Sequence, residues 1–290
     1  MAVAYRYADP VARVMGVLNV TPDSFSDGGM WADPDAALSH ARQMIGDGAD
    51  VIDVGGESTR PGARPVEARE EMRRILPVIE ALAGETVVSV DTRKEEVARA
   101  AVRAGASLIN DVSATLWPVA ADTGVGWVAM HMPADPAVMS RHARYDDVVR
   151  EVRDYLVARA EKAAAAGVGE VWIDPGIGFA KNAQHNLSLL KHLDALVGTG
   201  WPVLIGTSRK SFLGLIGGAS QPPSERLEGT VATSTWAITR GARMVRVHDV
   251  RPAVMAARLA GGPAVAGPGP GGRTCESKAA RSGAIGEGAS

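Results

Sequence analysis

The feature that most constrains the fold is a regular alternation of short apolar runs with longer stretches rich in Ala, Glu and Arg. Eight runs recur along the chain: Val14–Val20, Val51–Val54, Val87–Val90, Leu108–Ile109, Gly126–Met130, Val171–Ile173, Val203–Ile205 and Met244–Val247. The runs are continuous rather than alternating in polarity, which is typical of parallel strands covered on both faces. The pattern therefore predicts an α/β protein with a parallel sheet.

The stretches between the runs are predicted to be helices. The clearest are Pro34–Gly48, Glu67–Leu82, Glu95–Ala104, Tyr145–Ala166 and His185–Val197. Glycines 48, 84, 105 and 167 close several of the helical patterns, where the chain must adopt a left-handed conformation. Eight strand–helix repeats favour a single closed (β/α)₈ TIM barrel. The alternative is an open doubly wound sheet, whose dinucleotide-binding form lacks support because no Gly-x-Gly-x-x-Gly follows the first run.

Composition sets the domain limits and excludes several classes of protein. We expect an N-terminal extension at 1–12, the barrel at 13–261 and a disordered tail at 262–290, where Gly, Pro and Ala dominate. A net charge of −2 and a pI near 6.3 argue against nucleic-acid binding. No apolar stretch is long enough for a membrane span, and no secretory signal or cysteine pair is present, so a cytoplasmic protein is expected.

Polar side chains follow every apolar run. They include Asn19, Glu57–Arg60, Asp91, Asn110, Asp111, His131, Asp174, Ser208–Lys210, Arg246, His248 and Asp249. Any one of them could be only a helix cap. In a barrel, however, the carboxyl ends of all strands meet at one face, which carries the active site. The sequence therefore predicts a site for a polar substrate at this rim.

The residue types suggest the ligand. Asp91, Asn110 and Asp174 suit the N–H groups of a flat, nitrogen-rich ring. Arg246, His248, Arg209 and Lys210 are donors suited to a phosphorylated group, although a solvated charge cluster is the alternative. Two segments rich in Gly, Ser, Asp and Pro, residues 21–29 and 55–63, are typical of mobile loops that close over a substrate.

Long strings of the sequence resemble the dihydropteroate synthase family. They are Gly16–Gly29, Asp53–Ala63, Ser89–Thr92, Ile109–Ser113, Met130–Met132, Asp174–Phe179, Ser208–Ser211 and Arg246–Asp249. They occur in the family's order over residues 13–260. The resemblance implies a Mg²⁺-assisted transferase that joins a pterin methyl diphosphate to 4-aminobenzoate during folate synthesis. It also implies a homodimer and a target of sulfonamides.

The resemblance also implies roles for individual residues. Those implied at the pterin ring are Asp91, Asn110, Asp174 and Lys210, and those at the diphosphate are Asn19, Arg246 and His248, with Asn19 also reaching Mg²⁺. Those implied at 4-aminobenzoate are Phe25, Thr59, Pro61, Phe179, Ser208 and Lys210, and Arg60 is a further substrate-binding candidate. Asp91, Lys210, Arg246 and His248 are the catalytic candidates.

The sequence departs from the family pattern in three places, and two other functions stay open. Ala180 stands where glycine is more common, and the segments 114–118 and 133–136 are unusual. A pterin-binding methyltransferase uses a similar barrel, although a methyl donor has no diphosphate for the basic strand ends to hold. A non-catalytic pterin-binding paralogue is the other alternative.

Overall fold

The computed structural model describes residues 12–21, 34–58, 63, 65–133, 143–216 and 221–261. The strands in this part of the chain are β1 (Arg13–Asn19), β2 (Val51–Gly55), β3 (Val87–Asp91), β4 (Leu108–Asp111), β5 (Gly126–Met130), β6 (Val171–Asp174), β7 (Leu204–Ile205) and β8 (Met244–Val247). The N-terminal extension up to residue 11 and the tail at 262–290 lie outside the described residues, so both stay predictions.

The eight strands form one parallel sheet in the order β6-β5-β4-β3-β2-β1-β8-β7. β1 pairs with both β2 and β8, so the first and last strands are neighbours. A bridge between Ile173 and Val203 joins β6 to β7, and the Ile173 N–H donates to the Pro202 carbonyl at 3.0 Å. The TIM barrel is confirmed. The open doubly wound alternative is wrong, because its strand order reverses and leaves two free edges.

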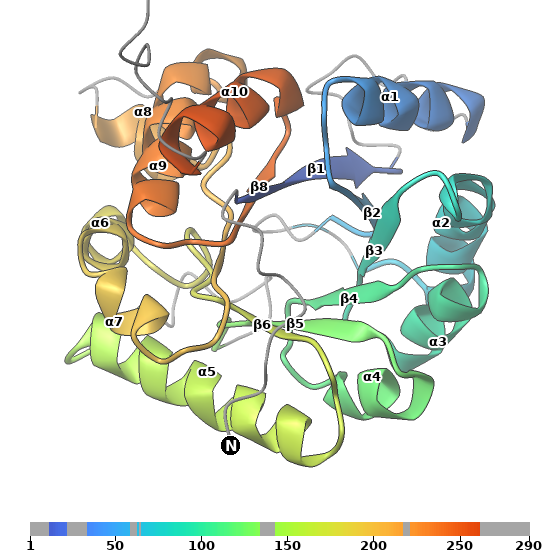
Figure 1. Ribbon diagram of the computed structural model, residues 1–290, viewed down its shortest axis with the longest axis horizontal. Coiled ribbons are helices and arrows are strands. Elements are labelled where there is room, and N and C mark those ends of the chain that lie inside the picture. Colours follow the sequence, from blue (N-terminus) through green and yellow to red (C-terminus); the bar gives the residue numbers. More distant parts are fainter. Residues whose placement is uncertain are drawn as a thin grey trace, which may run out of the picture.

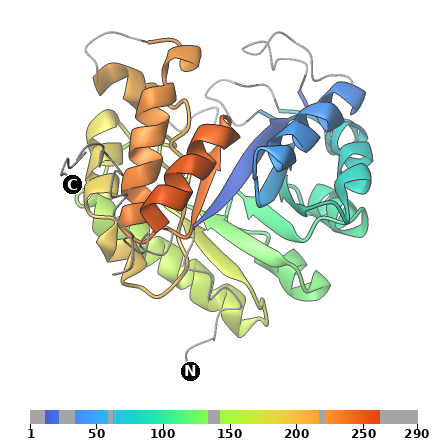
Figure 2. The ribbon, with the colours of Figure 1, turned by 45° about the horizontal axis from the view of Figure 1, so that its top comes forward.

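Helices surround the barrel. They are α1 (Pro34–Gly46), α2 (Ala68–Leu82), α3 (Glu95–Arg103), α4 (Trp117–Thr123), α5 (Val148–Ala165), α6 (Ala183–Lys191), α7 (Asp194–Val197), α8 (Ser211–Ile216), α9 (Leu227–Thr239) and α10 (Val250–Gly261), with a 3₁₀ turn at Pro223–Glu225. In Figure 1 the helices lie around the outside of the strands, with α1 to α5 following one another along the right and bottom and the later helices lying on the left and top. Figure 2 shows β1 between α1 and α10, where the first and last parts of the barrel meet. Among the described residues, none of the helices combines the length and apolar character needed to span a bilayer.

The apolar core has two main layers, and a third, small cluster of Val112, Met130, Met132 and Ala180 lies around the ends of β4, β5 and β6. The larger layer lies between the strands and the helices and includes Val14, Ile52 and Ile109. The smaller layer contains one side chain from each of seven strands: Met15, Val51, Leu108, Val128, Trp172, Leu204 and Met244. Because neighbouring residues on a strand point to opposite faces, this second set fills the barrel interior. The barrel is therefore a packed scaffold, and the site lies at its rim.

Local hydrogen bonds explain where helices differ from the sequence prediction. α5 begins at Val148 rather than Tyr145, because the Asp147 side chain caps it by accepting the Arg150 N–H at 3.0 Å. The unusual segment 114–118 leads into α4, and Asp111 organises it by accepting the N–H groups of Thr115 and Leu116.

One predicted helix is divided in the structure, and the predicted glycine conformations are confirmed. The predicted helix at 185–197 is two helices, α6 and α7, separated at His192, whose backbone leaves the helical region. Glycines 48, 84, 105 and 167 all have positive φ, as predicted.

Candidate active site

Four polar side chains from four strands form one hydrogen-bonded network near the carboxyl ends of the barrel strands. Arg246 of β8 donates from Nε to Asp53 Oδ2 of β2 at 2.6 Å, and from Nη2 to Asp91 Oδ2 of β3 at 2.7 Å. Asn110 of β4 donates from Nδ2 to the same Asp53 oxygen at 2.9 Å. The structure therefore brings Asp91, Asn110 and Arg246 together, as the sequence predicts, and adds Asp53 to them.

Burial controls the electrostatics of this network. Burial raises the pKa of the Asp91 carboxyl to about 7; Arg246 opposes the rise and the nearby charge of Asp53 adds to it. Asp53 is fully buried and Asp91 is 7% exposed. The Oδ1 atoms of both residues accept no hydrogen bond from the described part of the chain. Each is an acceptor that the N–H groups of a ligand could satisfy.

Gly55 brings Asn19 close to this network. Asn19 at the end of β1 is in register with Gly55, and Gly55 is in register with Asp91. A Cβ atom at position 55 would lie 3.5 Å from Asp91 Cβ and 3.8 Å from Asn19 Oδ1. With no side chain between them, Asn19 and Asp91 face the same space across the end of β2.

A second group forms where β6 and β7 end. Lys210 donates from Nζ to the Ile177 carbonyl, and its Nζ lies 4.4 Å from the centre of the Phe179 ring. Asp174 accepts the Gly176 N–H through Oδ1 at 2.7 Å. Burial lowers the pKa of Lys210 to about 8, and Asp174 opposes that change. Burial raises the pKa of Asp174, and Lys210 opposes that change in turn.

The β7 and β8 ends share a third group of contacts. Ser208 Oγ lies 3.0 Å from His248 Nδ1 and accepts the His248 backbone N–H at 3.1 Å. Arg209 forms a two-bond ion pair with Asp249, at 2.8 and 3.1 Å. Ser208 therefore lies beside His248, which is predicted to bind the diphosphate. Asp249 balances much of the charge of Arg209. The role of Ser208 at 4-aminobenzoate stays a prediction.

Four predicted residues, Phe25, Thr59, Arg60 and Pro61, lie outside the described residues. Asp53, in contrast, is a site residue to which the sequence reasoning gave no role. Its signal was present, because a charged residue inside the apolar run at 51–54 must find a buried partner. Which partner it finds depends on Arg246, 193 residues away in the chain.

An amide oxygen at the rim would suit a magnesium ion that arrives with a phosphorylated substrate. Among the described residues, no group of three or more His, Cys, Asp or Glu side chains could hold a metal by itself. Asn19 offers an amide oxygen at the end of β1, facing the same space as Asp91. Mg²⁺ keeps several waters and is commonly held by one or two protein oxygens together with substrate phosphates.

Comparisons with known proteins give the family. The profile described as "Pterin binding enzyme" matches residues 15–248. Dihydropteroate synthase of Mycobacterium leprae is 48% identical over 269 residues, which cover 88% of this chain and 95% of that protein. The chain belongs to the dihydropteroate synthase family. This membership favours the synthase over the methyltransferase, which was the main alternative among enzymes.

Solved structures of other dihydropteroate synthases have the same fold. A sulfonamide complex of the Yersinia pestis enzyme matches with a TM-score of 0.82 and 43% identity, covering 87% of this chain and 94% of that one. The Xanthomonas albilineans enzyme in complex with 7,8-dihydropteroate matches with a TM-score of 0.76 and 44% identity, covering 86% and 92%. These matches agree with the TIM barrel of this chain.

Proposed function

We propose that the protein condenses (7,8-dihydropterin-6-yl)methyl diphosphate with 4-aminobenzoate, giving 7,8-dihydropteroate and diphosphate. The observation that carries this proposal is the network of Asp53, Asp91, Asn110 and Arg246 at the strand ends of a chain in the dihydropteroate synthase family. Free carboxylate oxygens beside fixed cations suit a substrate with a donor-rich ring and an anionic arm.

The pterin ring is assigned to the rigid strand ends. Asp91 on β3 and Asp174 on β6 provide buried carboxylates, and Asn110 on β4 provides an amide already oriented by Asp53. Asp91 must be ionised to accept two N–H groups from the ring, and Arg246 supports that ionised form. Because these groups are held by strand pairing, the ring site is organised before the substrate arrives.

The leaving diphosphate is assigned to the β1 and β8 ends. The bond from the pterin methylene carbon to the diphosphate oxygen breaks, and diphosphate leaves with that electron pair. Arg246 and His248 stabilise the growing negative charge more in the transition state than in the ground state. Asn19 would hold Mg²⁺ there, and the ion would supply further positive charge to the diphosphate.

The amine of 4-aminobenzoate then forms the new carbon–nitrogen bond and releases a proton. Phe179 and Lys210, which contact each other, are assigned to this substrate, together with Ser208, Phe25, Thr59, Arg60 and Pro61. An aniline-type amine has a free electron pair at neutral pH and needs little help from a base. Mg²⁺, a homodimer and a cytoplasmic location stay predictions from the sequence.

Diphosphate release with and without 4-aminobenzoate tests this function. We expect release that depends on both substrates. Asp91→Asn should lower kcat/KM by about 10- to 150-fold, because one charge-assisted hydrogen bond contributes about 1.5–3 kcal/mol. Asp122→Asn is the matched control, since Asp122 pairs with Arg99 on the exposed surface. No release by the unmodified protein with both substrates would overturn the proposal in favour of a non-catalytic pterin-binding protein.

A further inference from the structure

One buried lysine at the rim has no part in the reaction described above. Lys181 follows the loop after β6 and is only 8% exposed. Its Nζ lies 3.0 Å from His131 Nδ1 and donates to the carbonyls of His131 at 3.2 Å, Gly176 at 3.1 Å and Phe179 at 3.0 Å. Four acceptors from two strand ends therefore surround one ammonium group, which has three N–H groups to donate.

The loop that Lys181 holds has an unfavourable backbone. Between residues 176 and 180, Gly176, Gly178 and Ala180 have positive φ values of 65°, 83° and 47°. Of these three residues Ala180 is the most strained, because an L side chain disfavours a positive φ. A Cβ atom at Gly176 would lie 2.1 Å from the His131 carbonyl oxygen, so the turn is pressed against the end of β5. Such a turn persists only when contacts outside it fix its shape.

The same turn carries groups assigned to both substrates. The Gly176 N–H is held by Asp174, and the Phe179 ring lies against Lys210. Lys210 also donates to the Ile177 carbonyl, so two ammonium groups bind the carbonyls of this one turn. Phe179 depends on the turn for its place, whereas Asp174 is also held in β6 by strand pairing.

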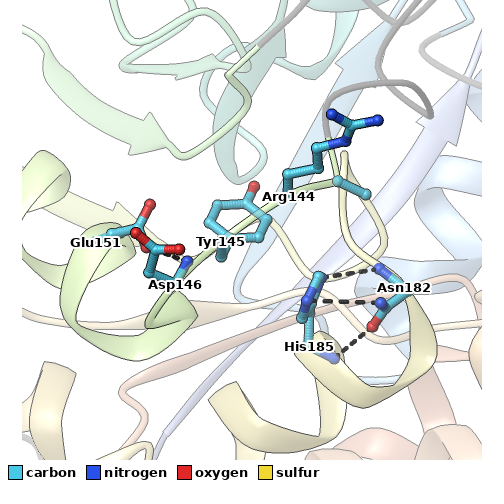
Figure 3. Close-up of a pocket in the computed structure, with 7 residues that line it drawn as sticks. Arg144, Tyr145, Asp146, Glu151, Asn182 and His185 are labelled. Carbon is cyan, nitrogen blue, oxygen red and sulfur yellow. Dashed lines mark hydrogen bonds between the residues drawn. The ribbon is translucent and has the colours of Figure 1, made fainter.

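The far side of the lysine is closed by aromatic rings. Burial lowers the pKa of His131 to about 3, with the charge of Lys181 adding to the effect, so His131 is neutral. Its Nδ1 can then accept from Lys181, since an ammonium group can only donate. The Tyr145 ring lies 6.0 Å from Lys181 Nζ, and its hydroxyl donates to the Ala180 carbonyl at 3.1 Å. Tyr145 in turn packs edge-on against His185, and Figure 3 shows these two side chains among those that line a pocket.

We propose that Lys181 is a positioning residue for 4-aminobenzoate: its ammonium ties the 176–180 turn to His131 on β5 and thereby fixes Phe179. Lys181 touches neither substrate and acts through the turn. The consequence for 4-aminobenzoate rests on the proposed function, whereas the order of the turn does not.

Lys181→Met tests the proposal, because methionine keeps most of the side-chain length and removes the ammonium. Lys191→Met, at the exposed end of α6, is the matched control. We expect the KM for 4-aminobenzoate to rise at least about tenfold in Lys181→Met, equal to about 1.4 kcal/mol. The KM for the pterin substrate should change much less. A general loss of folded protein would lower the apparent kcat without this split between the two substrates.

Hydrogen exchange of the 174–182 segment gives a second readout that needs no activity. It is measured at pH 6, below the pKa of about 7 to which burial lowers Lys181, so that the ammonium is charged. Faster exchange in Lys181→Met, with Lys191→Met unchanged, is expected. If the unmodified protein shows no synthase activity but this difference in exchange appears, the proposed function fails and the turn-holding role stands.

Unchanged exchange of the segment together with an unchanged KM for 4-aminobenzoate would overturn the proposal. Should Lys181→Met fail to fold, Lys181→Gln takes its place, because its shorter side chain keeps two N–H donors but loses the charge. A smaller change in the same direction is expected there. Exchange and KM equal to those of the unmodified protein in that variant would likewise refute the role of Lys181.

Discussion

Asp53 should organise the pterin site without contacting the reacting atoms, and two substitutions test this. Its Oδ2 accepts from both Asn110 Nδ2 and Arg246 Nε. Asp53→Ala removes both hydrogen bonds and leaves Arg246 with Asp91 as its remaining carboxylate partner in the network. Breaking a buried ion pair by removing one partner costs about 3–5 kcal/mol. Asp53→Asn keeps an oxygen that can accept both bonds, so we expect a smaller loss of about 1–3 kcal/mol.

Asp53→Asn should also change the acidity of its neighbour. The charge of Asp53 helps to raise the pKa of Asp91 to about 7. Removing that charge should lower the Asp91 pKa, which is measurable from the ¹³C shift of its labelled carboxyl group. Urea unfolding gives the stability of each variant. The matched control is Asp122→Ala, whose surface ion pair with Arg99 should contribute less than about 1 kcal/mol.

The result that refutes this reasoning is specific. If Asp53→Ala and Asp122→Ala have the same free energy of unfolding, the network around Arg246 does not depend on Asp53. If the Asp91 pKa is unchanged in Asp53→Asn, the two carboxylates do not interact, and the electrostatic account of the site is wrong.

Two more outcomes are expected. The pKa of His131 is about 3 in the folded protein and near 6.5 when unfolded, so protonation favours unfolding and stability falls as pH drops from 6.5 toward 3. His131→Gln should make that fall shallower by up to about 1.4 kcal/mol per pH unit in urea titrations, and parallel curves would contradict this. Gly178→Ala should lower kcat/KM by about tenfold or more, which corresponds to about 1.4 kcal/mol. The new Cβ would lie 2.8 Å from Lys210 Cδ, and an alanine is disfavoured at the φ of 83° found there. Gly169→Ala, which meets no atom within 4 Å, should leave kcat/KM unchanged, and equal effects would show that crowding of Lys210 is not the cause.

The sequence predicts the positions of those site residues that lie at the ends of strands. Asp91, Asn110 and Asp174 each close an apolar run, and parallel strands in a barrel bring such positions to one face. The positions of these residues therefore follow from local pattern and topology alone. The same reasoning placed Arg246 at the rim but could not place its guanidinium, since that depends on how far a long side chain reaches across β1 and β2.

The contacts that the sequence does not predict are those between side chains on distant strands. Asp111 and Asn110 are adjacent, yet Asp111 binds the N–H groups that lead into α4 while Asn110 binds Asp53. Because successive residues on a strand point to opposite sides, one position separates a structural carboxylate from a site amide. Likewise, Ala180 stands where the family pattern more often has glycine, and only the structure shows that this position has a positive φ, where an alanine adds strain to the turn.

The cost of the free site explains how it can bind a neutral ring. An unsatisfied buried acceptor costs about 1–3 kcal/mol, and Asp91 Oδ1 is one such atom within the described residues. In the free protein that cost appears as the raised pKa of Asp91, because taking up a proton removes the buried charge. A ring N–H that reaches Oδ1 removes the same cost without a proton from water. Leaving Asp91 Oδ1 without a partner therefore destabilises the free protein, and binding removes this destabilisation. Only a ligand that donates a hydrogen bond to Oδ1 has this effect.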